Sequence, residues 1–238
     1  MQTILISEIF GPTIQGEGAL IGRPTIFVRT GGCDFRCSWC DTLYAVLPEH
    51  KASWRPMVAD RIWAEVERLS GAKPILVTLS GGNPALQPLE PLLELGHGRG
   101  YAFAMETQGS VAKPWFARLD HLVLSPKGPS SGMEYRPEVL HACVEAGRGA
   151  NIGLKIVIFN DEDYVFAQGV AAGFPDLPVV LQAGTDPVSG NATGLAADSG
   201  AMAARLEWLL AKVCRDNWRD VTILPQMHVL LWGHKRGV

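Results

Sequence analysis

The chain has 238 residues, of which 47% are hydrophobic and 19% are charged, the composition of an ordinary globular protein with a generous core. Lysine and arginine number 21 against 24 aspartates and glutamates, so no excess positive charge is present to neutralise a nucleic-acid backbone, and we expect no nucleic-acid partner. The N-terminus lacks a basic segment and no stretch has the length and apolarity of a membrane span. We therefore predict a cytoplasmic protein that does not contact a membrane.

The first part of the chain leads to a group of cysteines. The apolar run Thr3–Ile6 predicts a strand, and the segment Phe10–Gly18, with three glycines and a proline, predicts a loop. The β-branched run Thr25–Thr30 predicts a second strand, which delivers the chain to the cysteines.

The remainder alternates between apolar strands and helical patterns. Apolar residues at helical spacing predict a helix from Pro56 to Leu69 that stops at Gly71, and Pro74–Ser80 predicts a strand. Further strands are predicted at Tyr101–Met105, His121–Leu124, Leu154–Ile158, Val179–Leu181 and Val221–Leu224, with helices over 86–95, 136–146, 162–172 and 199–213. This alternation indicates a parallel sheet. With about six or seven strands rather than the eight of a closed barrel, we predict an α/β fold, a partial, open (β/α) barrel formed by residues 1–238 as a single domain.

Polar residues and glycines follow nearly every predicted strand. Sites in α/β folds form at the carboxyl ends of strands, although helix caps and turns use the same residue types. These strand-end segments are Ser80–Pro84, Glu106–Gly109, Ser125–Lys127, Asn160–Asp161, Gln182–Gly184 and Pro225–His228.

Three of the five cysteines fall within eight residues, with the spacing C-x3-C-x2-C over Cys33, Cys37 and Cys40. Three soft thiolates can hold a thiophilic metal centre and leave one coordination position open, which indicates chemistry rather than a structural staple. Cys143 and Cys214 stand far from this group. An odd total argues against a disulfide framework, so we interpret these two as buried hydrophobic residues.

These motifs resemble those of a known family. The cysteine triplet resembles the cluster motif of radical S-adenosylmethionine enzymes, and Ser80-Gly81-Gly82-Asn83-Pro84 resembles their GGEP motif. Within that group, four segments resemble the 7-carboxy-7-deazaguanine synthases, namely Thr13–Gly18, Cys40-Asp41-Thr42, Ser125-Pro126-Lys127 and Gln226-Met227-His228. The resemblance runs from Glu8 almost to Val238.

The resemblance implies a fold, an activity and cofactors. It implies a barrel of radical S-adenosylmethionine type with a 4Fe-4S cluster on Cys33, Cys37 and Cys40, whose open iron binds S-adenosylmethionine. It also implies Mg2+ on Thr42. The family converts 6-carboxy-5,6,7,8-tetrahydropterin to 7-carboxy-7-deazaguanine with loss of ammonia, on the route to queuosine and other 7-deazapurines. A homodimer and an electron donor such as a flavodoxin are further implications.

Matching positions also imply the remaining site residues. Substrate would be contacted by Ile14, Gln15, Gly16, Glu17, Arg29, Ser80, His228 and Val238. Cofactor would be contacted by Trp39, Asp41, Gly81, Gly82, Ser125, Lys127 and Gln182. Asn83 departs from the motif, because it replaces the usual glutamate and has no negative charge to offer the cofactor's ammonium group.

Three other interpretations of the cysteine motif stay open from the sequence alone. A zinc site would normally have a fourth protein ligand, and an electron-transfer protein would need four cysteines to complete a cluster. A radical activase acting on a partner protein would share the cysteine motif but would need no pterin pocket.

Overall fold

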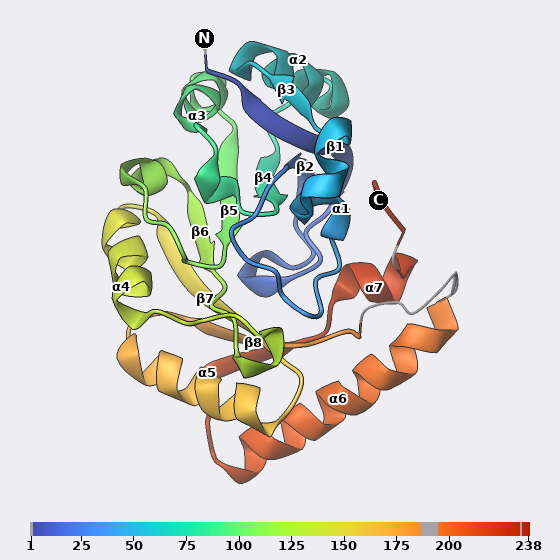
Figure 1. The fold of residues 1–238 in the computed structure, drawn as a ribbon, viewed down its shortest axis with the longest axis vertical. Coiled ribbons are helices and arrows are strands. Elements are labelled where there is room, and N and C mark those ends of the chain that lie inside the picture. The colour runs from blue at the N-terminus through green and yellow to red at the C-terminus, as the bar shows by residue number, and fades with distance from the viewer. Residues whose placement is uncertain (1, 187–194, 234) are drawn as a thin grey trace.

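A curved nine-stranded sheet organises the part of the chain that this computed structural model describes, residues 2–186, 195–233 and 235–238. The strands run in the order β3-β1-β2-β4-β5-β6-β7-β8-β9 (Figure 1). Their bounds are β1 Ile4–Ile14, β2 Pro24–Thr30, β3 Arg55–Met57, β4 Leu76–Gly81, β5 Ala102–Thr107, β6 His121–Leu124, β7 Asn151–Ile158, β8 Val179–Ala183 and β9 Val221–Leu224.

Seven of these strands form a continuous parallel run. Strands β2 and β4 to β9 pair in parallel, whereas β1 is antiparallel to β2 and β3 is antiparallel to β1. The end strands β3 and β9 do not pair with each other, so the sheet is open. The predicted open α/β architecture is confirmed, but the predicted number of strands is too low.

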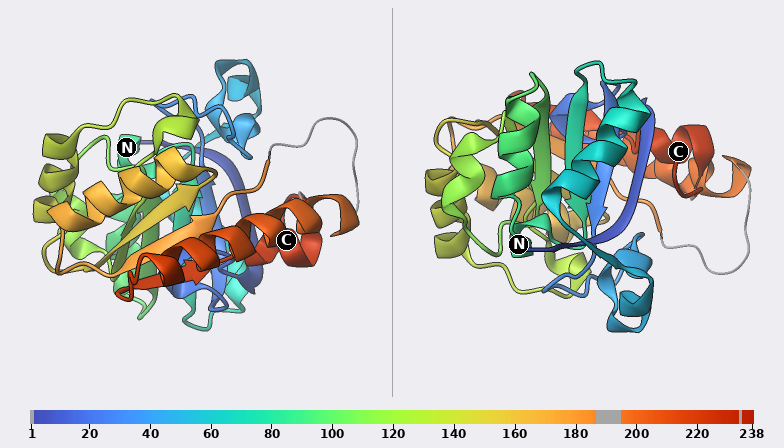
Figure 2. Two further views of the ribbon diagram at one scale, coloured as in Figure 1. Left: turned by 90° about the horizontal axis from the view of Figure 1, so that it is seen from below. Right: turned by 90° about the horizontal axis from the view of Figure 1, so that it is seen from above.

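The longer helices lie along the outer face of the sheet (Figure 2). These are α2 Ala59–Ser70, α3 Glu90–His97, α4 Pro137–Ala146, α5 Asp161–Gly173 and α6 Leu195–Arg215. The short helix α1, Leu43–Val46, follows the cysteines, and α7, Met227–Trp232, lies beside α6 and near the C-terminus (Figure 1). The amide of Met227 donates to the carbonyl of Gly16 at 2.9 Å, which ties α7 to the segment after β1.

Helix α2 shows why the periodicity was informative. Ile62, Trp63 and Val66 repeat at helical spacing and are buried, and the helix ends at Gly71 in the left-handed conformation with φ of 62°. The predicted start at Pro56 is wrong, because residues 55–57 form β3 against β1. An edge strand accepts a proline, since the missing N–H faces away from a partner.

The segment Phe10–Gly18 is a strand over its first half rather than the predicted loop. Strand β1 continues to Ile14, with Phe10 opposite Phe27 and a register shift before Thr13. Gly11 has φ of 128°, and a Cβ there would lie 2.9 Å from the carbonyl oxygen of Thr25. Pairing with β2 therefore overrides the turn signals, and a bulge accommodates them.

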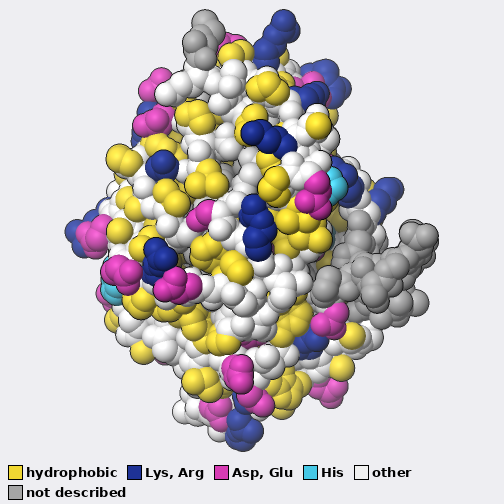
Figure 3. Space-filling view, in the orientation of Figure 1, with side chains coloured by type: hydrophobic (Ala, Val, Ile, Leu, Met, Phe, Trp, Pro, Cys, Tyr) yellow, Lys and Arg dark blue, Asp and Glu magenta, His cyan; other side chains and the backbone are white. Residues whose placement is uncertain are grey.

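The surface carries both charge signs. Lys and Arg side chains stand beside Asp and Glu on the face drawn in Figure 3. Among the described helices, none combines the length and apolarity needed to cross a membrane.

The two cysteines outside the triplet differ in burial. Cys143 is buried as predicted, whereas Cys214 is exposed, so the prediction for Cys214 is wrong.

The turn after β4 packs directly on the backbone after β2. A Cβ on Gly81 would lie 2.1 Å from the oxygen of Thr30, and a Cβ on Gly82 would lie 2.1 Å from that of Gly32. The amide of Gly82 donates to Thr30 at 3.1 Å. Only glycine permits this approach, which sets the position of the chain entering the cysteine segment.

We predict that Gly82→Ala will lower the free energy of unfolding by about 1–3 kcal/mol, because the added methyl group forces two backbone segments apart. Gly169→Ala is the control, since Gly169 lies within α5 and an added Cβ meets nothing within 4 Å. Its stability should rise by about 0.5–1 kcal/mol. Urea denaturation of both variants measures these changes. A free energy of unfolding for Gly82→Ala equal to that of the parent would contradict the close packing of the two backbone segments.

Candidate active site

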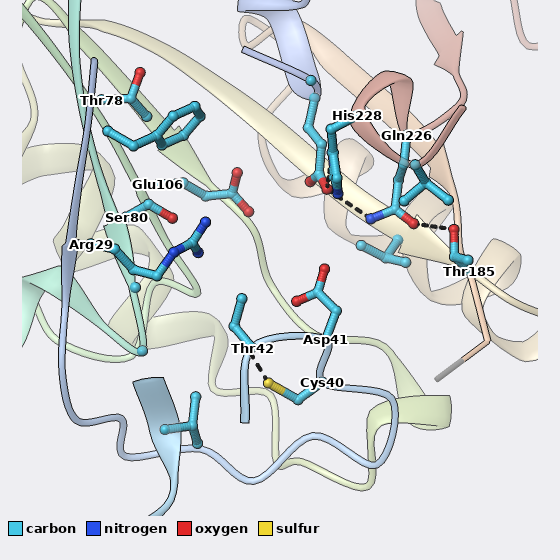
Figure 4. Close-up of a pocket in the computed structure, with 18 of the residues that line it drawn as sticks. Arg29, Cys40, Asp41, Thr42, Thr78, Ser80, Glu106, Thr185, Gln226 and His228 are labelled. Carbon is cyan, nitrogen blue, oxygen red and sulfur yellow. Dashed lines mark hydrogen bonds and ion pairs between the residues drawn. The ribbon is translucent and has the colours of Figure 1, made fainter. Parts of the chain in front are cut away.

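A cavity of about 260 Å3 opens at the carboxyl edge of the parallel strands. Its wall combines residues from β1, β2, the cysteine segment, β4, β5, β7, α7 and the C-terminus. In Figure 4, Arg29, Ser80 and Glu106 lie on one side, Gln226 and His228 on the other, and Asp41 and Thr42 between them.

Nearly all predicted site residues line this cavity. They are Ile14, Gln15, Gly16, Glu17, Arg29, Cys33, Cys37, Trp39, Cys40, Asp41, Thr42, Ser80, Gly81, Gly82, Lys127, His228 and Val238. Segments from both ends of the chain thus meet in one place, although the role of each residue stays a prediction.

Ser125 and Gln182 are the two predicted residues that do not line the cavity. Both are fully buried. The hydroxyl of Ser125 accepts a hydrogen bond from Lys127 at 2.8 Å, and the Gln182 side chain accepts one from the amide of Gly18 at 3.4 Å. These hydrogen bonds show how the two side chains are held, and the expected contact of each with cofactor stays a prediction.

The cysteine segment is held on both sides. A Cβ on Gly31 would lie 2.4 Å from the Trp54 ring, so this indole packs directly on the backbone before Cys33. On the other side, the Ser38 hydroxyl donates to the carbonyl of Ser130 at 2.7 Å, and the Trp39 indole donates to the Ser130 hydroxyl at 2.9 Å. The cysteines are thereby presented on a supported loop.

The three thiols are half-buried and protonated in the metal-free protein. Burial raises the pKa of Cys37 to about 11, and it also raises the pKa of Cys33 and of Cys40. The ammonium of Lys127 opposes this effect at Cys37. Metal binding must therefore displace protons from these thiols.

The spread of the thiols argues against a single zinc ion. Among the described residues, only Glu17, Asp41 and His228 bring three potential ligand atoms within 4.8 Å of one another. Tetrahedral zinc at Zn–S of about 2.3 Å requires sulfurs about 3.8 Å apart. A polynuclear cluster accepts a wider set of thiolates, and three ligands leave one iron free for another group. The site therefore fits a cluster better than zinc.

A buried charge centre forms the opposite wall. Lys155 is 3% exposed and makes ion pairs with the carboxylates of Glu17 and Glu106, the latter at 2.5 Å. Glu17 also accepts a hydrogen bond from Gln226 at 2.7 Å, and the His228 Nδ1 lies 3.7 Å from it. No role was predicted for Lys155 or Glu106. The available signals were a lysine within the apolar run of β7 and a glutamate at the end of β5.

The ionisation of this centre follows from its contacts. Burial alone would raise the pKa of Glu17, but the charges of Lys155 and His228 hold that pKa well below its usual range. Burial alone would lower the pKa of Lys155, but Glu106 and Glu17 raise it above its usual range. The carboxylates of Glu17 and Glu106 thus share one buried ammonium at the wall of the cavity.

Arg29 is oriented by Glu8, a residue that sequence reasoning passed over. The Arg29 Nε donates to Glu8 at 2.8 Å, and the Tyr44 hydroxyl donates to the same carboxylate at 2.8 Å. Arg236 lies with its guanidinium carbon 3.5 Å from the centre of the Tyr44 ring. This contact holds the C-terminal segment, including Val238, against the cavity.

Comparison with known proteins gives the family of the chain. The chain is 44% identical over 241 residues to the 7-carboxy-7-deazaguanine synthase of Bacillus subtilis (strain 168), covering 99% of this chain and 98% of that protein. The chain belongs to the 7-carboxy-7-deazaguanine synthase family. The Bacillus cereus enzyme of the same name is 39% identical over 245 residues and is covered in full. Membership confirms the predicted family and, with it, that the chain is an enzyme of radical S-adenosylmethionine type. No protein-family model matches the chain.

Solved structures share the fold. QueE from Escherichia coli matches with a TM-score of 0.66 at 24% identity, over 93% of this chain and 94% of that one. Streptococcus suis SuiB bound to S-adenosylmethionine matches with a TM-score of 0.56 at 12% identity, over 84% of this chain and 50% of that one. The open sheet therefore recurs in a protein solved with S-adenosylmethionine.

We predict that Lys155→Met will lower the free energy of unfolding by about 3–5 kcal/mol at pH 8, because two carboxylates lose their buried partner. Without Lys155, burial raises the pKa of Glu17, so protonation relieves the penalty and the deficit narrows as pH falls from about 8 to 5. The depressed Glu17 pKa of the parent keeps its contribution intact over this range.

Urea denaturation across pH measures this effect. Lys73→Met, at an exposed position, is the control and should change stability by less than about 0.5 kcal/mol. A Lys155→Met deficit that does not vary with pH would contradict the coupling to Glu17.

Proposed function

We propose that this chain converts 6-carboxy-5,6,7,8-tetrahydropterin to 7-carboxy-7-deazaguanine with loss of ammonia, a step toward queuosine and other 7-deazapurines. The observation that carries the proposal is that the cysteine triplet faces the same cavity as Arg29 and the Glu17–Lys155–Glu106 centre. The cavity therefore offers a cation for a carboxylate and carboxylates for N–H donors. The name of the relatives that match along their whole length supports the same reaction.

Cys33, Cys37 and Cys40 would hold a 4Fe-4S cluster, and S-adenosylmethionine would fill its open position. Together they supply one-electron chemistry that abstracts hydrogen from the substrate. The protein's own part is to position the reacting groups and to exclude water. Gly81 and Gly82 bring backbone to the cavity, while Trp39, Asp41 and Lys127 add side chains around the cysteines.

The opposite wall would bind the pterin. Glu8 accepts from the Nε of Arg29 and leaves the two terminal nitrogens of Arg29 to bind the substrate carboxylate. The Arg29 guanidinium reaches into the cavity (Figure 4). Glu17 and Glu106 would accept hydrogen bonds from the ring N–H groups. Gln226 and His228 fix the far side through their contacts with Glu17.

Thr42 would bind Mg2+ together with the substrate carboxylate and water. Mg2+ accepts a sparse protein shell because it keeps several waters. The carboxylate of Asp41 belongs to the set of three ligand atoms within 4.8 Å and could accept hydrogen bonds from those waters.

Four further predictions belong to the same proposal, on the number of domains, the electron donor, the oligomeric state and the location. One continuous sheet supports a single domain over residues 1–238. The cysteine loop carries exposed residues such as Arg36 and Ser38, which would let an electron donor such as a flavodoxin approach the cluster. We also propose a homodimer and a cytoplasmic location, in keeping with free thiols and the composition.

The decisive experiment is anaerobic incubation of the cluster-reconstituted protein with reductant, S-adenosylmethionine and the carboxypterin. Mass spectrometry should show 7-carboxy-7-deazaguanine and ammonia release. An intact cluster without any deazapurine would overturn the proposal and would favour an activase.

We predict that Cys37→Ala will abolish cluster assembly and product formation while the chain stays folded, because the cluster loses one of three ligands. Iron and sulfide analysis with circular dichroism measures both properties. Cys214→Ala is the matched control, since Cys214 is exposed and distant in sequence from the triplet. Full turnover in Cys37→Ala would remove Cys37 from the ligand set.

We predict that Thr42→Ala will raise the Mg2+ concentration needed for half-maximal rate by about 10-fold or more without loss of iron, because a ligand oxygen is removed. Thr42→Ser retains the hydroxyl and should behave like the parent. A Mg2+ titration of the rate separates the two, and identical curves for Thr42→Ala and parent would exclude Thr42 as a ligand.

A further inference from the structure

Asn83, the residue that departs from the GGEP motif, is a fully buried junction and does not line the cavity. It follows β4 and Gly82 and begins the short 3-10 helix Pro84–Leu86. Its backbone amide donates to the carbonyl of Gly32 at 2.8 Å, one residue before the first cysteine. Position 83 is thus directed at the cysteine segment rather than at the cavity.

The side chain of Asn83 uses all of its hydrogen-bonding capacity. Its oxygen accepts from the amide of Ala85 at 3.1 Å and from the hydroxyl of Thr107 at 2.8 Å. Its nitrogen contacts the Asp34 carboxylate at 2.9 Å and the Ser110 hydroxyl at 3.1 Å. An amide can fill these four positions because it offers two donors and two acceptor sites.

Asp34 receives a second amide on the same oxygen. The Gln108 Nε2 donates to the Asp34 Oδ1 at 2.6 Å and lies 3.6 Å from the sulfur of Cys33. The carboxylate that follows Cys33 in sequence is therefore clamped between Asn83 and Gln108. These contacts connect the ends of β4 and β5 to the cysteine loop.

A carboxylate at position 83 could still accept from Ala85 and Thr107, but it could not make the contact with Asp34. It has no N–H to donate, and it would lie at hydrogen-bond distance from the carboxylate of Asp34 in a place with no water access to residue 83. The negative charge in this junction belongs to Asp34, and residue 83 must be its neutral donor.

We propose that Asp34 and Asn83 are a matched pair of positioning residues, in which the Asn83 amide holds the cysteine loop through Asp34 instead of contacting a bound cofactor. The pair is coupled, so the tolerated residue at one position depends on the residue at the other. The proposal rests on the proposed function in one respect, that the cysteine loop binds a cluster.

A double-mutant cycle tests the pair with Asn83→Asp, Asp34→Asn and the exchanged double variant. Asn83→Asp should lower the melting temperature of metal-free protein by about 4–12 °C and reduce the iron and sulfide taken up on reconstitution. Asp34→Asn keeps an amide oxygen that can accept from both neighbours, so its effect should be smaller. In the double variant, the amide introduced at position 34 donates to the carboxylate introduced at position 83, and at least about half of both losses should return.

Asn160→Asp is the matched control. Asn160 also begins a helix and accepts a backbone hydrogen bond, from Asp163 at 3.0 Å, but its position is exposed. Aspartate caps a helix as well as asparagine does, so melting temperature and iron uptake should stay at parent values.

Additive effects of the two substitutions would overturn the proposal. If Asn83→Asp yields no soluble chain, the double variant decides, since a soluble, iron-binding double variant supports the pairing and an insoluble one contradicts it. The melting temperatures are measured on metal-free protein and do not depend on the reaction. A failed pairing therefore shows in the melting temperatures, whereas a failed reaction shows only in the deazapurine assay.

Discussion

The close approach of two backbone turns is the constraint on which the site depends. Gly81 and Gly82 lie against the carbonyls of Thr30 and Gly32, at distances that no side chain permits. This contact joins the ends of two neighbouring parallel strands, so the direction in which the chain leaves β2 is set before the first cysteine. Asn83 extends the same contact from backbone to side chains, because it bonds Asp34 beside Cys33. The cysteine loop is thus positioned by its neighbours in the sheet.

The cavity itself is organised by charge. Lys155 is buried on β7 and can stay ionised only because Glu17 and Glu106 face it. Glu17 and Glu106 share the ammonium of Lys155, whereas Arg29, whose Nε is engaged by Glu8, provides a cation at the same cavity. A ligand that carries both a carboxylate and N–H donors is complementary to this arrangement. The cysteines lie at a third side, where redox chemistry can reach such a ligand.

Local patterns predicted the elements but not always their pairing. The apolar spacing of α2 identified a helix, yet the turn residues of Phe10–Gly18 suggested a loop where β1 continues to Ile14. Long-range pairing with β2 decided that segment, and no local propensity reports it. Ser125 and Gln182 show what the structure adds for the site. Their match to the family predicts cofactor contacts, and the structure shows the protein partners that hold both side chains in place.

The sequence by itself indicated the kind of chemistry, because the spacing of three cysteines is typical of a metal centre with an open position, and the alternation of strands and helices predicted a parallel sheet. Only the tertiary structure decided which polar side chains complete the site. Glu17 meets Gln226, 209 positions away, and Lys155, 138 positions away. The sequence does not show which residue will contact a lysine within an apolar strand or a glutamate at a strand end. The role of such a residue depends on burial and on opposite charges that only the folded sheet brings together.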